Sequence, residues 1–311
     1  MLKLTMDVYS GRENPTCLVD DENEVRALLK AMADNRAELS DKISDNTQLG
    51  FRGFQVELMH DGLANDYGFG SSIFVPSLEA TGADLASDVT DRLFRAMEIW
   101  LSKHRDSLDV SEQMEIGLRQ LAIASRGEGG RVSLTDELGD TPSAESQDVS
   151  VRESRGLVSC TIELESYNPG FWNNNPTILS RNNCYNYASN KRTDTFAQPG
   201  RGCGRQYTAT TCTDVANAAM CDGLHKRYNC FPNTEIPRYL VALVVAPGPV
   251  FKDFHWYRKN SQGFWSHKPG STAVRNTDNS GKIIMNPETC NRGSYTNFCG
   301  YFYTCKSQKI R

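Results

Sequence analysis

The stretch Arg-Asn-Asn-Cys-Tyr-Asn-Tyr-Ala-Ser-Asn occupies residues 181–190 of this chain. Asn182 or Asn183 is suited to cap a helix, because an asparagine side-chain oxygen accepts a hydrogen bond from the first turn. Such a cap places Cys184 at or near the positive end of the helix dipole, where a thiolate is favoured over a thiol. The unpaired N–H groups of a first turn also receive a developing oxyanion. The stretch therefore predicts a nucleophilic cysteine at the start of a helix.

An aromatic β-hairpin supplies candidate partners for this thiol. Residues 239–245 form an apolar run typical of a central buried strand, and residues 253–258 and 264–267 predict the next two strands. His255 lies within the first strand of this hairpin, and His267 lies twelve residues later on the neighbouring strand. Opposed side chains of adjacent strands lie within about 5 Å of each other, so the register decides whether the two rings meet.

These residues suggest a catalytic set in which Cys184 attacks a carbonyl, His255 transfers the proton and His267 orients the imidazole. Other candidates for the third role are Asp253, Asp278 and Asn279. Each of the three main residues also has a structural interpretation. Cys184 can be half of a disulfide, His255 a histidine packed in an aromatic core, and His267 the cap of a turn.

The order of these motifs resembles the papain-like fold used by the NlpC/P60 and CHAP group of cysteine peptidases and amidases. The resemblance covers roughly residues 165–270. Its motifs are Cys184 in Asn-Cys-Tyr-Asn-Tyr-Ala, His255 in Asp-Phe-His-Trp-Tyr-Arg, and His267 in Trp-Ser-His-Lys-Pro-Gly. It implies a thiol hydrolase of peptide or peptidoglycan-type amide bonds with a thioester intermediate, and a cell-wall or toxin-like role.

The whole chain is predicted to be α+β with three segments. Residues 1–126 predict a small α+β domain that targets the protein or resembles a pro-segment. Residues 127–155 are acidic and rich in glycine and serine, which predicts a flexible linker open to proteolysis. Residues 156–311 form a cysteine-rich domain with the helix-borne cysteine and the antiparallel sheet. The elements expected in the first segment are strands at 1–9, 53–58 and 72–75 and helices at 22–34, 84–104 and 111–124.

Charge is distributed unevenly between the two halves. Residues 156–311 hold 18 Lys and Arg and 9 Asp and Glu, whereas the first 155 residues hold 16 and 29. An acidic N-terminal part that docks on a basic C-terminal part explains this pattern, as do two domains with unrelated surfaces. The basic half also suits an anionic polymer. Because the cations are scattered rather than clustered, we expect no nucleic-acid partner.

Nine of the ten cysteines lie in the C-terminal half, and Cys17 is the exception. Four disulfides would leave one thiol, for which we choose Cys184. No Cys-x-x-Cys pair occurs, so we expect no structural zinc, and we expect no cofactor. Disulfides indicate an extracellular or other oxidising compartment, although residues 1–8 carry no recognisable signal peptide. The longest apolar run, residues 239–245, is too short to span a membrane.

A non-catalytic alternative accounts for the same residues. In it the chain is a disulfide-stabilised secreted structural or binding protein that recognises a carbohydrate or a protein through its aromatic sheet. The candidate substrate or carbohydrate contacts are Trp172, Trp256 and Trp265, which would otherwise serve as packing residues. Residues 7–15, Asp-Val-Tyr-Ser-Gly-Arg-Glu-Asn-Pro, form a further motif that matches no family known to us.

Overall fold

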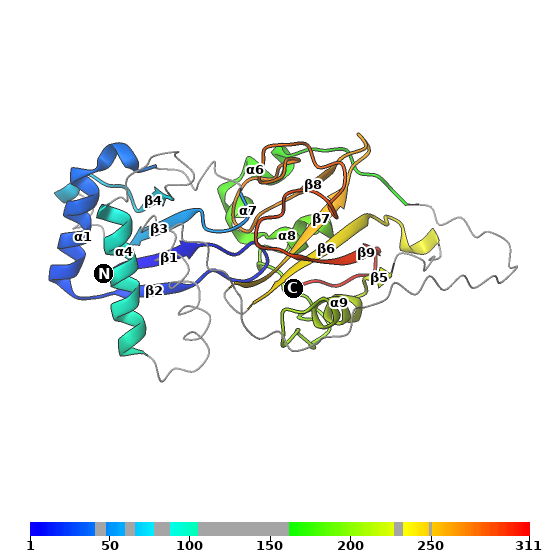
Figure 1. Cartoon of the computed structure of the whole chain (residues 1–311), viewed down its shortest axis with the longest axis horizontal. Helices are drawn as coiled ribbons and strands as arrows, with labels where there is room; N and C mark the ends of the chain where they lie inside the picture. Colours follow the sequence, from blue (N-terminus) through cyan, green and yellow to red (C-terminus); the bar gives the residue numbers. More distant parts are fainter. Residues whose placement is uncertain (41–47, 60–65, 78–87, 105–161, 227–232, 249–250) are drawn as a thin grey trace, which may run out of the picture.

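The computed structural model is α+β, with two antiparallel sheets that follow one another along the longest axis of the molecule (Figure 1). It describes residues 1–40, 48–59, 66–77, 88–104, 162–226, 233–248 and 251–311. We call residues 1–104 the N-terminal part and residues 162–311 the C-terminal part. The predicted linker at 127–155 lies outside the described residues, so the predicted domain boundaries remain predictions.

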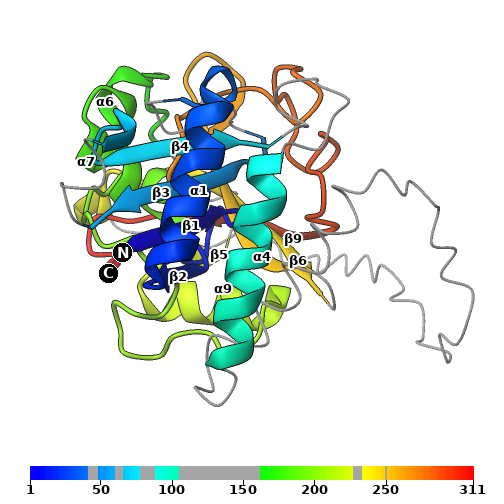
Figure 2. The same cartoon turned by 90° about the vertical axis from the view of Figure 1, so that its left-hand side faces the viewer.

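The N-terminal part contains a four-stranded antiparallel sheet with the order β2-β1-β3-β4. Its elements are β1 (Leu2–Asp7), β2 (Thr16–Val19), α1 (Glu22–Asp34), the 3-10 helix η1 (Arg36–Glu38), β3 (Gly53–Leu58), β4 (Ser72–Pro76) and α4 (Asp88–Lys103). Helices α1 and α4 run across one face of this sheet (Figure 2). The strands and helices expected up to residue 104 are therefore present, with ends that differ by a few residues, and the helix expected at 111–124 lies outside the described residues.

Alternation of side chains explains why the helices cover only one face. Leu2, Leu4 and Met6 of β1 are buried, while Lys3 and Thr5 between them are partly exposed. This period of two gives a strand with one apolar face. The apolar stripe of α1 packs on that face, and Asp21 caps the helix by accepting a hydrogen bond from the Glu24 N–H.

The C-terminal part contains a five-stranded antiparallel sheet with the order β5-β9-β6-β7-β8. Its strands are β5 (His225–Lys226), β6 (Leu240–Pro247), β7 (Lys252–Lys259), β8 (Trp265–His267) and β9 (Asn297–Tyr303). Its helices are α6 (Gly170–Asn173), α7 (Pro176–Arg181), α8 (Cys184–Ala188), α9 (Cys212–Cys221) and the 3-10 helix η2 (Asn233–Glu235). As predicted, the apolar run forms the central strand, β6, which pairs with β9 and β7. It is apolar along its length because both faces of this sheet are covered.

The two faces of this sheet belong to different cores. Val241, Leu243 and Val245 of β6 pack against α8 and α9. Ala242 and Val244, which point the other way, pack with the loops that follow β8. Register then assigns every β7 side chain to one face, because directly paired residues of an antiparallel ladder share a face.

The two parts are joined by a carboxylate at the start of β7. Asp253 is fully buried, and its oxygens accept the backbone N–H groups of Ser10 at 2.7 Å, Gly11 at 3.3 Å and Arg12 at 3.0 Å. The Tyr295 hydroxyl donates to the same carboxylate. Successive N–H groups that converge on one anion neutralise it, which offsets the cost of burying the charge.

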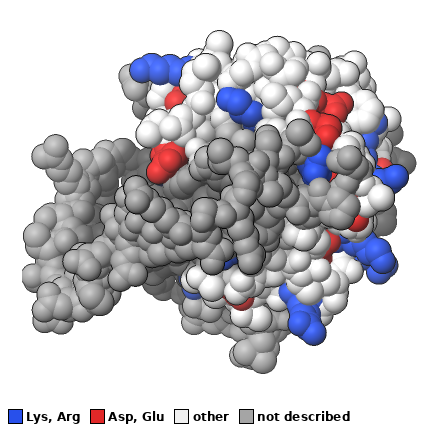
Figure 3. Space-filling view, turned by 90° about the vertical axis from the view of Figure 1, so that its right-hand side faces the viewer, with Lys and Arg blue, Asp and Glu red and all other residues white. Residues whose placement is uncertain are grey.

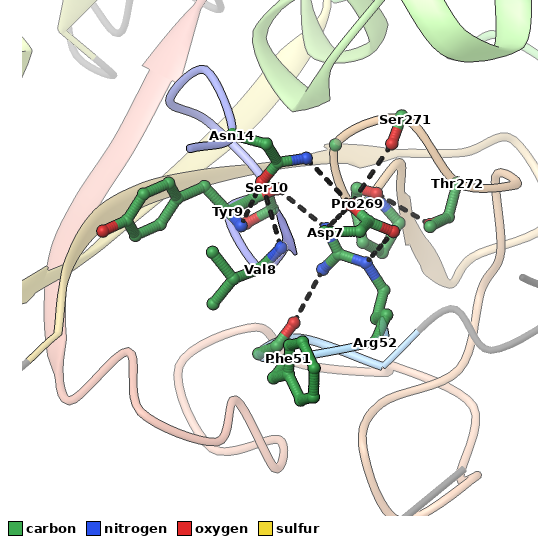
Figure 4. Close-up of polar contacts among 12 residues, drawn as sticks. Asp7, Val8, Tyr9, Ser10, Asn14, Phe51, Arg52, Pro269, Ser271 and Thr272 are labelled. Carbon is green, nitrogen blue, oxygen red and sulfur yellow. Dashed lines mark hydrogen bonds and ion pairs between the residues drawn. The ribbon is translucent and has the colours of Figure 1, made fainter. Parts of the chain in front are cut away.

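A buried ion pair supports the loop that supplies these N–H groups (Figure 4). Arg52 binds the Asp7 carboxylate through Nη2 at 2.6 Å and Nε at 3.0 Å, and Nη2 also donates to the Tyr9 carbonyl. Asn14 donates to Asp7 and accepts the Tyr9 N–H, which closes the turn. Ser271 of the C-terminal part also donates to Asp7. The motif at residues 7–15 is thus the connection between the two parts.

No helix in the described portions of the chain is long and apolar enough to cross a membrane.

Gly11 permits the close approach of this loop to β7. A Cβ added there would lie 2.3 Å from the Phe254 carbonyl oxygen. We expect Gly11→Ala to lower the free energy of unfolding by about 2–3 kcal/mol, because the loop must move and weaken its bonds to Asp253. Urea unfolding measures this change.

Gly70→Ala is the matched control, since a Cβ at Gly70 meets no atom within 4 Å. Equal urea midpoints for the Gly11→Ala and Gly70→Ala variants would show that the loop is not closely packed against β7.

Candidate functional site

Helix α8 begins as the sequence predicts, with Asn183 as its N-cap. The Asn183 side-chain oxygen accepts the N–H groups of Tyr185 and Asn186, and the Asn186 side chain accepts the Asn183 N–H in return. This reciprocal capping box fixes the first turn. Cys184 is therefore the first residue of the helix, although α8 is only five residues long.

The environment of Cys184 does not suit a nucleophile. Its backbone N–H, the expected oxyanion donor, points to the Ser10 carbonyl at 3.5 Å. Its Sγ lies 4.0 Å from the Phe254 carbonyl oxygen, and the residue has no exposed surface. Burial raises the pKa of the thiol well above its ordinary value, and the charge of Asp253 raises it further. The group is thus a neutral thiol, whereas catalysis requires a thiolate.

The structure brings the two predicted histidines together. His255 Nε2 lies 2.7 Å from His267 Nδ1, and His267 Nε2 lies 3.0 Å from the Thr277 carbonyl. His267 Nε2 is also contacted by the Arg275 Nε–H at 3.2 Å, and one of the two rings carries the proton shared between His255 Nε2 and His267 Nδ1. The Nδ1 atom of His255 is buried and has no hydrogen-bond partner among the described residues. His267 thus lies in hydrogen-bond contact with the ring of His255.

Cys184 and His255 are not brought together. Phe254 and Trp256 pair with Val245 and Leu243 and belong to the same core as Cys184. His255 lies between them in β7 and pairs with Val244, on the opposite face of the sheet. A proton cannot pass directly between side chains on opposite faces of a sheet, so the predicted thiol–imidazole pair does not form.

The alternative third residues are occupied by structural bonds. Asp253 binds the loop at residues 10–12. Asp278 accepts N–H groups of the turn that follows it, including those of Ser280 and Lys282. Asn279 exchanges two hydrogen bonds with the backbone of Leu49, which adds a second contact between the parts. Neither Asp278 nor Asn279 takes the place of His267 beside His255.

The three predicted tryptophan contacts are buried. Trp172 is 1% exposed and packs with Tyr187, while Trp256 is fully buried and Trp265 is 4% exposed. An aromatic platform for sugars needs an exposed ring face. These tryptophans are core residues, and the prediction that they contact a substrate is wrong.

The loop at residues 10–12, whose role is not apparent from the sequence, contacts the cap of α8. The Gly11 carbonyl accepts hydrogen bonds from Nδ2 of Asn183, the cap of α8, and from Gln198 Nε2, at 2.8 Å each. The Ser10 carbonyl faces the Cys184 N–H of the same helix. The unusual composition of residues 7–15 was the available signal, but nothing in it identifies the partners. No cluster of three or more His, Cys, Asp or Glu suited to a metal occurs among the residues that the structure describes.

Insoluble matrix shell protein 1 of Ruditapes philippinarum is 47% identical to this chain over 135 residues, which are 43% of the chain and 86% of that protein. No family model matches the chain, and no solved structure matches it.

The prediction of a cysteine hydrolase is therefore wrong. The similarity is to a matrix protein of a shell and not to a peptidase or amidase. The geometry also argues against a hydrolase, because the Cys184 thiol is neutral and the sheet separates it from both histidines. The peptidase, cell-wall and toxin roles are withdrawn with it, and the non-catalytic alternative fits better.

Native Cys184 is expected to resist iodoacetamide at pH 7 and to react only after unfolding, because its thiol is buried and protonated. Peptide mapping after labelling in buffer and in urea measures this difference. Cys290 is the internal comparison, because it is a free, partly exposed cysteine; burial raises its pKa to about 11, so it is expected to label slowly but faster than Cys184. Rapid labelling of Cys184 in the folded chain below pH 7 would contradict this assignment.

The histidine pair predicts that stability falls with acidity. Burial lowers the pKa of both His255 and His267 well below the ordinary value of about 6.5. The unfolded chain then binds protons that the folded chain does not, so stability is lost as pH falls below that value. We expect a loss of up to about 1.4 kcal/mol per pH unit for each histidine.

Urea unfolding at pH 5 to 8 measures this slope, with His267→Gln as the comparison. In the variant, the slope of the unfolding free energy against pH below pH 6.5 is expected to decrease by the contribution of about one proton. An unchanged slope would show that His267 is not buried in its neutral form.

Proposed function

We propose that this chain, which belongs to the family of insoluble matrix shell protein 1, is a non-catalytic, disulfide-stabilised structural protein of an extracellular matrix. The observation that carries this proposal is the 47% identity to a shell matrix protein over 86% of its length. The separation of Cys184 from His255 by the sheet supports the non-catalytic role.

Two disulfides between described cysteines support the extracellular location, because such bonds persist in oxidising compartments. Both hold α9. Cys212, its first residue, is bonded to Cys299 of β9, and Cys221, its last residue, is bonded to Cys203. Cys184 is a free thiol, as expected, but Cys290 and Cys305 are free as well. The disulfides thus fasten a short helix and its loop to the sheet, which suits a protein that must keep its shape outside the cell.

The papain-like identity of the C-terminal part is retained as a proposal about fold alone. Its support is the chain order, in which the helix with Cys184 precedes an antiparallel sheet with His255 and His267. In this proposal the C-terminal part has the papain-like arrangement of Cys184, His255 and His267. Its helix cap and the two faces of its sheet stabilise the fold and do not form an active site. The three-segment layout of residues 1–126, 127–155 and 156–311 is likewise a proposal.

Docking of the acidic N-terminal part on the basic C-terminal part is also proposed. An ion pair between Glu13 and Arg201 crosses between the parts and supports it. On the face seen in Figure 3, lysines and arginines stand apart, with acidic residues among them.

Fractionation of the tissue that produces the chain tests the structural role. Antibodies raised against the recombinant chain are expected to detect it in the extracellular material that remains after extraction with detergent and urea. An intracellular soluble enzyme serves as the fractionation control. Recovery of the chain with that enzyme would overturn the proposal.

A parallel assay addresses catalysis in the same preparation. Purified chain and its Cys184→Ala variant are expected to show the same background hydrolysis of peptide and peptidoglycan amides, because the thiol takes no part in chemistry. Hydrolysis that Cys184→Ala abolishes would show an enzyme in place of a structural protein.

A further inference from the structure

We propose that a cavity of about 720 Å³ between the residue 7–15 motif and the start of α9 binds the anionic groups of an acidic polysaccharide. Its wall is formed by Arg12 and Glu13 of the motif, by the segment that leads into α9, and by Pro247 and Lys252 at the facing ends of β6 and β7. The proposal deepens the proposed function by naming a matrix partner. It rests on the proposed function only in assuming that the chain meets polysaccharides in an extracellular matrix.

Three cations line the cavity, against one acidic side chain. They are Arg12, Arg201 and Lys252, and the acid is Glu13. Guanidinium groups present paired donors that match the oxygens of a sulfate or a carboxylate. The cavity therefore has the charge and the donor geometry that an oxyanion requires.

Arg12 is held in place before any ligand arrives. It is 8% exposed, its Nη1 donates to the Lys252 carbonyl at 2.8 Å, and its guanidinium carbon lies 5.0 Å from the centre of the Tyr9 ring. Its backbone is fixed as well, because the Arg12 N–H binds Asp253. A cation fixed in this way binds an anion with little loss of side-chain entropy.

Arg201 is held loosely and is able to exchange its partner. Its Nη atoms lie 3.3 and 3.4 Å from Glu13 Oε1, and its Nε lies 3.4 Å from Gln206 Oε1. The Arg201 and Glu13 side chains are 35% and 65% exposed. Exposed pairs of this kind contribute little, so an incoming anion replaces Glu13 at low cost.

The other nearby carboxylates are already neutralised by donors. Asp253 accepts the backbone N–H groups of residues 10–12. Asp214 accepts the N–H groups of Thr208 and Ala209 in front of α9. Thr211, the N-cap of this ten-residue helix, lines the cavity, so the positive end of the helix dipole adds to the field there.

The neutral residues of the wall favour a sugar polymer over an acidic peptide. Hydroxyl and amide side chains predominate among them, namely Gln198, Gln206, Tyr207, Thr208, Thr210 and Thr211. Such groups match the many hydroxyls of a glycan. A bound peptide instead needs a free strand edge or apolar pockets, and Pro247 at the end of β6 offers no N–H.

Fluorescence anisotropy of labelled polysaccharides on the purified full-length chain tests the site. The probes are chondroitin sulfate, hyaluronate, neutral dextran and poly-L-glutamate. We expect chondroitin sulfate or hyaluronate to bind. Both carry a carboxylate in every disaccharide and chondroitin sulfate adds a sulfate, so tighter binding of chondroitin sulfate would show that the added sulfate contributes to affinity. Dextran is expected not to bind, and rising salt is expected to weaken the binding.

Arg201→Ala is expected to weaken this binding about tenfold, as loss of a hydrogen-bonded charge pair does. Arg201→Ala combined with Lys252→Ala is expected to weaken it further. Arg205→Ala is the matched control, because it removes the same charge from the same loop, where Arg205 is exposed and does not line the cavity. The control is expected to change affinity less than about twofold. Equal urea midpoints for the variants confirm that each is folded.

Three results would overturn the proposal. The first is that neither acidic polysaccharide binds. The second is that Arg201→Ala and Arg205→Ala weaken binding equally. The third is that poly-L-glutamate binds more tightly than either polysaccharide, with the same dependence on Arg201. The last result would assign the cavity to an acidic protein. None of them bears on where the chain is located, which the tissue fractionation measures separately.

Discussion

The buried carboxylate of Asp253 is the constraint on which the arrangement of the two sheets depends. A carboxylate without exposed surface is tolerated only when donors satisfy its oxygens. Here three successive N–H groups of residues 10–12 and the Tyr295 hydroxyl do so. If the loop moved away, the charge would remain buried without partners. The loop and the start of β7 are therefore stabilised together, and the two parts of the chain behave as one structure.

The same loop determines what the helix with Cys184 is able to do. In the predicted enzyme the N–H at the start of this helix would hold an oxyanion. In the structure the Ser10 carbonyl lies against that N–H, and the Gly11 carbonyl accepts from the capping Asn183. Groups that would support catalysis if they faced an open cleft instead anchor the N-terminal part. The geometry of a capped helix is thus compatible with a purely structural role.

Membership in a family of shell matrix proteins is consistent with this use of polar residues. Hydrogen bonds from Asp253, Arg52 and Asn279 connect segments that are distant in sequence, and disulfides fasten α9 at both ends. Buried polar networks of this kind are costly when incomplete and rigid when complete. The hydrogen bonds and disulfides together hold the loop of residues 10–12, β7 and α9 in fixed relative positions.

The sequence by itself determined the local structure. The periodicity of α1, the alternation in β1, the apolar run of β6 and the asparagine cap before Cys184 all follow from interactions within a few residues, which is why they were predictable. The sequence also placed His255 and His267 on neighbouring strands. Only the tertiary structure decided the faces. A shift of one residue in register moves every side chain of a strand to the other side. The register between β6 and β7 placed His255 on the face opposite Cys184, and packing between separate elements buried the tryptophans. The role of the motif at residues 7–15 depends on partners more than 170 positions away, which no local pattern identifies.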